Sequence, residues 1–192
     1  MAYLAVDFNN LMDLSGFSNS LLKNHFTLYQ GYVNNTNKVA DSLVSCIKEG
    51  KSATPEYAEL KRRFGWEFNG MRLHELYFGN LSKTPSTLPE SSPLYKKICE
   101  EFASFENWEA DFRSTGAMRG IGWVALYYDQ AGKRLFNCWI GEHDVGHPSG
   151  AFPLLVMDVF EHAYMLDYGL KKADYINAFF VAIDWKAVQS RF

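Results

Sequence analysis

The sequence predicts an α+β fold, in which a long N-terminal helical hairpin is followed by a C-terminal α/β unit with a small three-stranded antiparallel sheet. Two observations predict this fold. In the first part of the chain, apolar residues recur at steps of three and four, the period of an amphipathic helix. After residue 121 the period changes to two, which is typical of half-buried strands. Helices that are separated along the chain from a short sheet indicate α+β rather than a doubly wound architecture.

The N-terminal part of the sequence predicts three helices. The first covers residues 18–48, where an apolar stripe follows one helical face. A second begins at 54–56, where Thr, Pro and Glu supply an N-cap, a first-turn proline and an early acid, and it ends near Gly65. A third covers 72–81. Together they predict a helical hairpin domain over residues 1–82.

A stretch rich in proline, serine and threonine, at 83–92, predicts a linker. The C-terminal α/β domain is expected over 93–192. Its expected elements are helices at 94–103 and 104–113, strands at 122–128, 134–140 and 152–157, a turn at 129–133, and further helices between 164 and 181.

Composition excludes several classes of protein. Nineteen Lys and Arg oppose 22 Asp and Glu, and this net charge of −3 argues against nucleic acid as a partner. The apolar runs, such as that at 123–128, are far shorter than the roughly 20 residues that cross a bilayer. The first residues include Asp7 and do not resemble a secretory signal. Cys46, Cys99 and Cys138 form no CxxC pair, which favours a reducing compartment, so a cytoplasmic protein without membrane association is expected.

The strongest chemical signal is the segment Asp-Val-Phe-Glu-His-Ala-Tyr at 158–164. An apolar strand ends there in Asp158, and His162 follows four residues later. A carboxylate at the end of a buried strand is costly unless it is paired or bound to a cation. With an imidazole it offers the mixed oxygen and nitrogen ligands that zinc, iron or manganese take. A salt-bridged strand end without a metal explains the same pattern.

Two more histidines lie on the predicted N-terminal helices. His74 lies among aromatic residues. His25 shares a helical face with Tyr29 and Tyr32, because four and seven helical steps return close to the starting direction. Each pattern alone is typical of a packed core residue as well as of a metal ligand, so spacing leaves both interpretations open.

Five ordered segments together resemble the iron/manganese superoxide dismutases, from about residue 20 to the end of the chain. They are Tyr-Val-Asn-Asn-Thr-Asn at 32–37, Phe-Asn-Gly at 68–70 leading to His-Glu-Leu-Tyr-Phe-Gly-Asn-Leu at 74–81, Gly-Ile-Gly-Trp at 120–123, the segment at 158–164, and Asp-Tyr-Ile-Asn-Ala-Phe-Phe at 174–180 followed by Trp185. Five matches in the same order make coincidence improbable.

The resemblance implies one Fe or Mn ion per subunit. The ligands would be His25 and His74 from the hairpin, with Asp158 and His162 from the α/β unit, so the metal would join the two domains. It also implies an oxidoreductase that disproportionates two superoxide anions to oxygen and hydrogen peroxide, with two protons supplied. Iron and manganese take near-identical ligands in this family, so the sequence does not distinguish between them.

The resemblance also gives roles to side chains around the metal. Tyr32 is expected as the gateway tyrosine of the substrate channel, and His143 as the group that hydrogen-bonds the metal's bound solvent. Trp123 and Phe160 are expected to wall the site. His147, beside a proline, is expected to be exposed and inert.

The first metal ligand has two candidates. The family ligand usually precedes the gateway tyrosine by eight residues, whereas His25 precedes Tyr32 by seven, so an ungapped alignment places Asn24 in the ligand position. A π-bulge would absorb this difference. Seven steps keep His25 on the face of Tyr32, whereas eight ideal steps rotate Asn24 about 80° away. His25 is therefore the preferred ligand, and Asn24 with a three-ligand or empty site is the alternative.

The same resemblance implies a homodimer with an altered interface. Relatives usually bridge the subunits with a histidine and a tyrosine, but here Leu28 or Tyr29 replaces the histidine and Met165 replaces the tyrosine. Losing both partners of a hydrogen bond costs less than losing one. Glu161 is expected to face the partner's His162. The rival hypothesis is a non-catalytic or metal-poor relative that keeps the fold as a structural or binding dimer.

Overall fold

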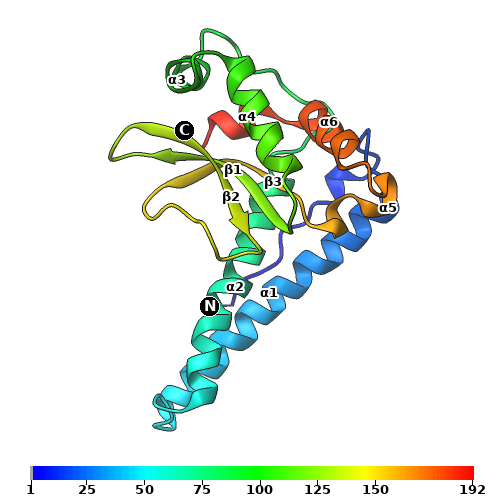
Figure 1. Cartoon of the computed structure of the whole chain (residues 1–192). Helices are drawn as coiled ribbons and strands as arrows, with labels where there is room; N and C mark the ends of the chain where they lie inside the picture. Colours follow the sequence, from blue (N-terminus) through cyan, green and yellow to red (C-terminus); the bar gives the residue numbers. More distant parts are fainter. Residues whose placement is uncertain (1) are drawn as a thin grey trace.

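Two long antiparallel helices form the N-terminal part of the molecule (Figure 1). In the computed structural model, which describes residues 2–192, α1 (Asn19–Lys48) and α2 (Pro55–Phe78) follow a short 3₁₀ helix, η1 (Asn9–Leu11). The side chains of Ser18 and Thr54 cap the two helices by accepting a hydrogen bond from a backbone N–H three residues later. The predicted helical hairpin is therefore confirmed.

The second helix is longer than the sequence predicted. A helix end near Gly65 and a separate helix over 72–81 are both wrong, because α2 continues through these positions to Phe78. A glycine inside a helix costs only about 1 kcal/mol relative to alanine, which the packing of α2 along α1 outweighs. The first helix is α-helical throughout and contains no π-bulge. Over residues 2–192, no helix combines the length and the apolar character that crossing a membrane would need.

The C-terminal part contains the sheet and the remaining helices. Its elements are α3 (Pro93–Phe102), α4 (Phe105–Ala117), β1 (Gly122–Asp129), β2 (Arg134–Gly141), β3 (Phe152–Asp158), the 3₁₀ helix η2 (Glu161–Ala163), α5 (Met165–Tyr168), α6 (Lys172–Ala182) and α7 (Trp185–Gln189). The three strands are antiparallel and have the order β2-β1-β3. The predicted α+β fold with a three-stranded antiparallel sheet is confirmed.

The segment at 83–92 has neither helix nor strand and runs beside the C-terminal end of the chain. Leu81 forms an isolated bridge with Ile183, and the Ser86 hydroxyl donates a hydrogen bond to the Asp184 carboxylate. The end of the hairpin is thus fastened to the last helices of the molecule.

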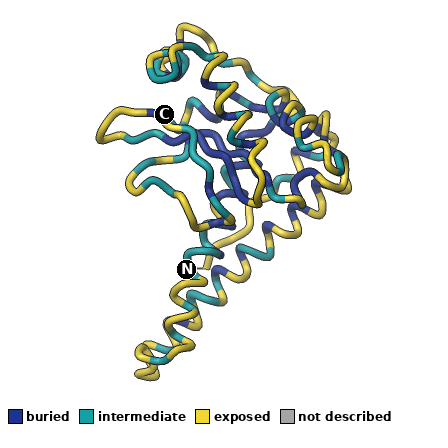
Figure 2. Tube along the Cα trace, in the orientation of Figure 1, coloured by how far each residue is buried: buried dark blue, intermediate teal, exposed yellow. Residues whose placement is uncertain are grey.

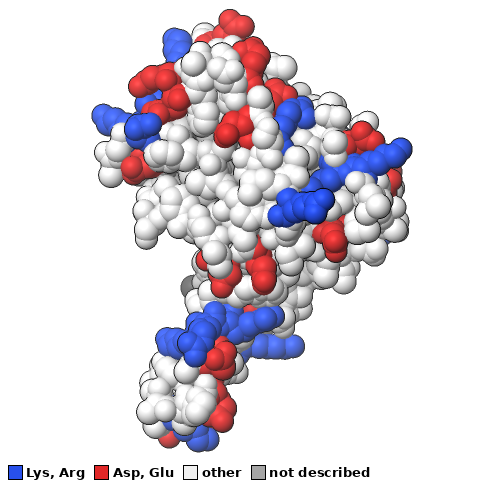
Figure 3. Space-filling view, viewed as in Figure 1, with Lys and Arg blue, Asp and Glu red and all other residues white. Residues whose placement is uncertain are grey.

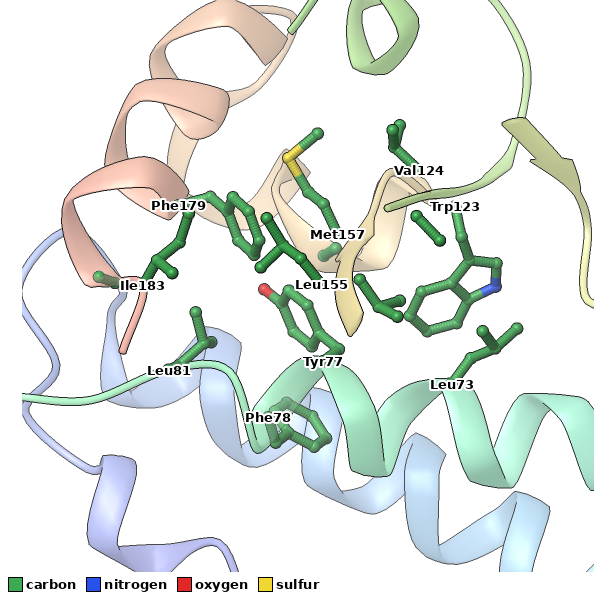
Figure 4. Packing of buried hydrophobic residues seen from close by; sticks show 14 of the residues in the cluster. Leu73, Tyr77, Phe78, Leu81, Trp123, Val124, Leu155, Met157, Phe179 and Ile183 are labelled. Carbon is green, nitrogen blue, oxygen red and sulfur yellow. The ribbon is translucent and has the colours of Figure 1, made fainter. Parts of the chain in front are cut away.

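One hydrophobic core joins the hairpin to the sheet. Figure 4 shows Leu73 and Tyr77 of α2 facing Trp123 of β1 and Leu155 of β3 across this core. Figure 2 shows buried residues in the inner part of the hairpin, where α2 meets the sheet and α1 meets η2, whereas the far end of the hairpin is exposed. That far end carries both acidic and basic side chains (Figure 3). The inner part of the hairpin is therefore the part that can hold a buried site.

Candidate metal centre

Four side chains from both parts of the molecule converge where the hairpin meets the sheet. His25 comes from α1, His74 from α2, Asp158 from the end of β3 and His162 from η2. One possible ligand atom from each lies within 4.8 Å of the others. The first three residues are buried, and His162 is partly exposed. The structure thus brings together the four residues that the resemblance assigned to a metal.

One oxygen of Asp158 is the common neighbour of three imidazoles. Its Oδ2 lies 3.1 Å from His25 Nε2, 3.2 Å from His162 Nε2 and 3.7 Å from His74 Nε2. Its Oδ1 accepts a hydrogen bond of 2.8 Å from the Phe160 N–H, which orients the carboxylate. Burial opposes ionisation, but His162 and His25 hold the pKa of Asp158 well below its ordinary value, so this residue offers an anionic oxygen.

His74 is oriented by its own helix. Its Nδ1 lies 2.6 Å from the Gly70 carbonyl oxygen, so Nδ1 carries the proton and donates it, and Nε2 has a free lone pair. That Nε2 is buried and has no hydrogen-bond partner among the described residues. Burial, and then the neighbouring His25, lowers the pKa of His74 well below its ordinary value, so the ring is neutral at pH 7. A buried neutral nitrogen without a partner is what a metal ligand provides.

The donor set fits an iron or manganese ion. Three imidazole nitrogens and one carboxylate oxygen are ligand types that both metals take, and a metal would complete the environment of His74 Nε2. His25 also has a pKa lowered by burial, and its Nε2 lies in the cluster. Asn24, in contrast, is exposed. The geometry therefore favours His25 over Asn24 as the ligand on α1.

A hydrogen-bonded chain of Trp123, His143 and Tyr32 lies beside the four ligands. Trp123 Nε1 donates to His143 Nδ1 over 3.0 Å, and His143 Nε2 lies 2.8 Å from the Tyr32 hydroxyl. Burial lowers the pKa of His143 to about 4, so the ring is neutral at pH 7. An indole N–H can only donate, so the single ring proton of His143 is on Nε2. This Nε2–H donates to the Tyr32 oxygen, and the Tyr32 hydroxyl keeps its own hydrogen for another acceptor.

Aromatic rings line the space around the four ligands. Trp123 is fully buried, and its ring centroid lies 4.9 Å from that of His74. The Phe160 ring stacks between His143 and His162, with centroid distances of 4.8 and 5.1 Å. The rings of Trp123 and Phe160 thus lie beside His74 and His162 of the cluster.

Three other residues named from the sequence lie outside the cluster. The Tyr29 hydroxyl donates to Glu75 Oε1 and accepts from the Val6 N–H, each over 2.9 Å, so it links the N-terminal segment to both long helices. Glu161, the first residue of η2, and Met165, the first residue of α5, are both exposed. These two residues therefore face the surface in the isolated chain.

The prediction that His147 is exposed is wrong. The ring is partly buried, and its Nε2–H donates to the His143 carbonyl oxygen over 2.9 Å. Its Nδ1 accepts from the Tyr127 hydroxyl over 2.7 Å. The neighbouring proline indicated a surface loop, but the chain turns back after β2 and places His147 against β1. His147 therefore supports the backbone of His143.

Trp66 and Glu142 also lie at the site and were not identified from the sequence. The Trp66 ring centroid lies 4.5 Å from that of His143, and its Nε1 donates to Glu142 Oε2 over 3.0 Å. The two residues are 76 positions apart. No local spacing could have indicated that they are in contact.

Comparisons with known proteins agree with this geometry. Residues 90–191 match the family model described as "Iron/manganese superoxide dismutases, C-terminal domain". The chain is 36% identical to an iron superoxide dismutase of Aquifex pyrophilus, covering 94% of this chain and 86% of that protein. It is 34% identical to a manganese superoxide dismutase of Haloferax volcanii, covering 88% of this chain and 82% of that protein. An iron superoxide dismutase of Tetrahymena pyriformis is also 34% identical, covering 88% and 87%.

Both the matched model and these relatives carry the same activity in their names, and the ligand cluster fits the metals that they name. The chain therefore belongs to the iron/manganese superoxide dismutases, enzymes that use Fe or Mn to disproportionate superoxide to oxygen and hydrogen peroxide.

Proposed function

We propose that the four converging side chains hold one metal ion per subunit and that Tyr32 and His143 deliver protons to the substrate. The observation that carries this proposal is the buried Nε2 of His74, which has no hydrogen-bond partner within residues 2–192 and lies 3.7 Å from the Asp158 carboxylate. A bound iron or manganese ion supplies the one-electron redox chemistry that converts two superoxide anions and two protons to oxygen and hydrogen peroxide. The protein side chains supply the protons and exclude water.

Tyr32 is the proposed proton donor. Burial raises the pKa of Tyr32 to about 12, so its hydroxyl is protonated at neutral pH. The Nε2–H of His143 donates to the Tyr32 oxygen over 2.8 Å, which leaves the hydroxyl hydrogen free for the substrate. Trp123 holds His143 in the required tautomer. The pair therefore offers a proton in a defined direction before the substrate arrives.

Trp123 and Phe160 are proposed to keep bulk water away from the reacting anion. Trp123 is buried against His74, and Phe160 covers the space between His143 and His162. Exclusion of water strengthens the attraction between the anionic substrate and the positive charge of a bound metal.

The active form is proposed to be a homodimer. An open, mostly apolar groove lies beside the metal ligands and is lined by Leu21, Asn24, Thr27, Leu28, Glu161, His162, Met165 and Leu166. Leu28 and Met165 can pack together without the polar bridge that relatives have, and Glu161 can reach the partner's His162. We expect sedimentation equilibrium to give a dimer for the natural chain and a monomer for Leu28→Glu. A monomeric natural chain would contradict this proposal.

Residues 1–82 and 93–192 are proposed as two domains joined by the segment at 83–92.

The cytoplasm is the proposed location of the protein. The three cysteines are free thiols, as expected in a reducing compartment. Cell fractionation with an antibody against the chain tests the location.

The decisive experiment measures bound metal and superoxide consumption together. We expect one Fe or Mn per purified chain, and in His74→Ala less than about a tenth of that metal, with the rate falling in proportion. Full metal content without activity in the natural chain would favour the non-catalytic alternative. Unchanged metal content in His74→Ala would mean that the ligand set is wrong.

A further inference from the structure

Trp66 lies across the outer side of the Tyr32–His143 pair. Its ring meets His143 edge to face at a centroid distance of 4.5 Å and lies 5.5 Å from the Tyr32 ring. The Arg63 guanidinium lies 4.0 Å from the Trp66 ring, and Arg63 in turn pairs with the buried Glu67 over 2.7 Å. The indole is therefore held on α2 by its neighbours while it contacts the two proposed proton-delivering residues.

The indole N–H of Trp66 also connects α2 to the residue that precedes His143. Its Nε1 donates to Glu142 Oε2 over 3.0 Å. Glu142 has a φ of 50°, a left-handed conformation that residues other than glycine rarely adopt, and its N–H donates to the Ile121 carbonyl oxygen over 3.1 Å. The direction of the His143 side chain depends on this turn, so a contact that fixes Glu142 also fixes His143.

We propose that Trp66 is a positioning residue that holds His143 against Tyr32, through its hydrogen bond to Glu142 and through its ring. This inference rests on the proposed roles of Tyr32 and His143. Trp123 hydrogen-bonds the His143 ring from the sheet, whereas Trp66 contacts the ring from the hairpin and hydrogen-bonds the preceding residue, Glu142. Loss of the hairpin anchor lets the ring turn and weakens the 2.8 Å contact between His143 Nε2 and the Tyr32 hydroxyl.

Three substitutions isolate the hydrogen bond. Trp66→Phe keeps an aromatic ring but removes the N–H, Glu142→Ala removes the acceptor, and Glu142→Gln keeps an acceptor oxygen. We expect Trp66→Phe and Glu142→Ala each to lower the rate per bound metal about fivefold, the effect of one hydrogen bond. The double variant should be no slower than the slower single variant, because both changes remove the same contact. Glu142→Gln should retain most of the rate.

Trp108→Phe is the matched control. It removes another indole hydrogen bond of 3.0 Å, from Trp108 to Asn137, at the packing of α4 on the sheet. We expect the rate per bound metal to be unchanged in this control. A second readout needs no metal, because ¹⁵N NMR of the histidine rings in the metal-free protein reports the hydrogen bond from the His143 Nε2–H to the Tyr32 oxygen. Trp123 keeps the proton on Nε2 in every variant, so we expect the natural Nε2 signal in Glu142→Gln and a shifted, broadened Nε2 signal in Trp66→Phe and Glu142→Ala.

His143→Ala separates this inference from the proposed function. If His143→Ala loses activity while Trp66→Phe and Glu142→Ala keep the natural rate and the natural His143 signals, the inference about Trp66 is overturned and the role of His143 stands. If His143→Ala keeps the full rate, both the proposed role of His143 and the inference fall. A reduced rate and an altered His143 Nε2 signal in Trp66→Phe, with the control unchanged, support the inference.

Discussion

The hairpin and the C-terminal unit hold their metal ligands in different ways. His25 and His74 stand on regular helices, and their rings meet because α1 packs along α2, with centroids 5.0 Å apart. Asp158 is the last residue of β3 and His162 follows it in η2, and a local hydrogen bond from the Phe160 N–H orients the carboxylate. Ligands placed by packing are sensitive to changes of volume, whereas ligands placed by hydrogen bonds are sensitive to changes of donor and acceptor.

The histidines of the two halves also differ in the direction of their pKa shifts. Burial lowers the pKa of His25 and of His74. Burial also opposes protonation of the more exposed His162, but the Asp158 carboxylate outweighs it, and the pKa of His162 is raised. The hairpin therefore contributes neutral nitrogens, and the C-terminal unit contributes the charge that a cation needs.

Asp158→Asn should give the largest effect, because it tests the half that depends on hydrogen bonds and charge. The substitution keeps the volume but removes the negative charge that three imidazoles share. We expect metal content and dismutation rate to fall by at least about a hundredfold, more than the loss of a supporting group would cause. Elemental analysis and a superoxide-consumption assay measure both. Asp174→Asn, on the exposed side of α6, is the control and should change neither. Full metal binding by Asp158→Asn would show that the charge of the C-terminal unit is not needed to hold the metal.

The pH dependence of stability in the metal-free protein should separate the two halves. Because the folded-state pKa of His25 and of His74 is lowered, their contribution is complete above about pH 6.5 and is lost as the pH falls. The raised pKa of His162 has the opposite effect, since its contribution is complete below about pH 6.5 and is lost as the pH rises through the folded pKa. The lowered pKa of Asp158 adds a further loss of stability that begins only as the pH falls below about 4, toward the folded-state pKa.

Urea unfolding of the metal-free protein between pH 8 and pH 4 measures the contributions of the three histidines. We expect the free energy of unfolding to fall below pH 6.5, because two buried histidines outweigh one that is partly exposed. His25→Gln should make this fall shallower, and His162→Gln should remove the loss of stability above pH 6.5. A stability that increased steadily from pH 8 to pH 5 would show that His162 dominates, contrary to the comparison.

The elements whose signals are local could be predicted from the sequence. The predicted strands at 122–128, 134–140 and 152–157 differ from the observed ones by one residue at one end. Asp158 and His162 form a short motif, so the same segment also indicated half of the ligand set. His25 and His74 were identified only through the family resemblance, since each alone has the pattern of a core residue.

The parts that could not be predicted depend on contacts between distant segments. The continuation of α2 through Gly65 depends on packing against α1, which outweighs local helix propensity. The contact between Trp66 and Glu142 depends on where a turn after β2 lies relative to α2. His147 was assigned to the surface because a proline follows it, although its partners come from β1 and its own turn. Local patterns carry no information about such contacts.

Two glycines of α2 test the dependence of the hairpin on packing, with the smallest expected effects. A Cβ on Gly70 would lie 2.6 Å from a ring carbon of Tyr32, whereas a Cβ on Gly65 would have no neighbour within 4 Å. Gly65→Ala should raise the free energy of unfolding by about 1 kcal/mol and leave the rate unchanged. Gly70→Ala should not raise the free energy of unfolding, because its methyl group collides with the Tyr32 ring. The resulting displacement of Tyr32 should lower the rate per bound metal about threefold. Urea unfolding and the superoxide-consumption assay measure both variants. Equal stability and equal rates in the two variants would mean that close packing does not position Tyr32. The contrast between a hairpin ordered by packing and a C-terminal unit ordered by hydrogen bonds would then apply only to the metal ligands.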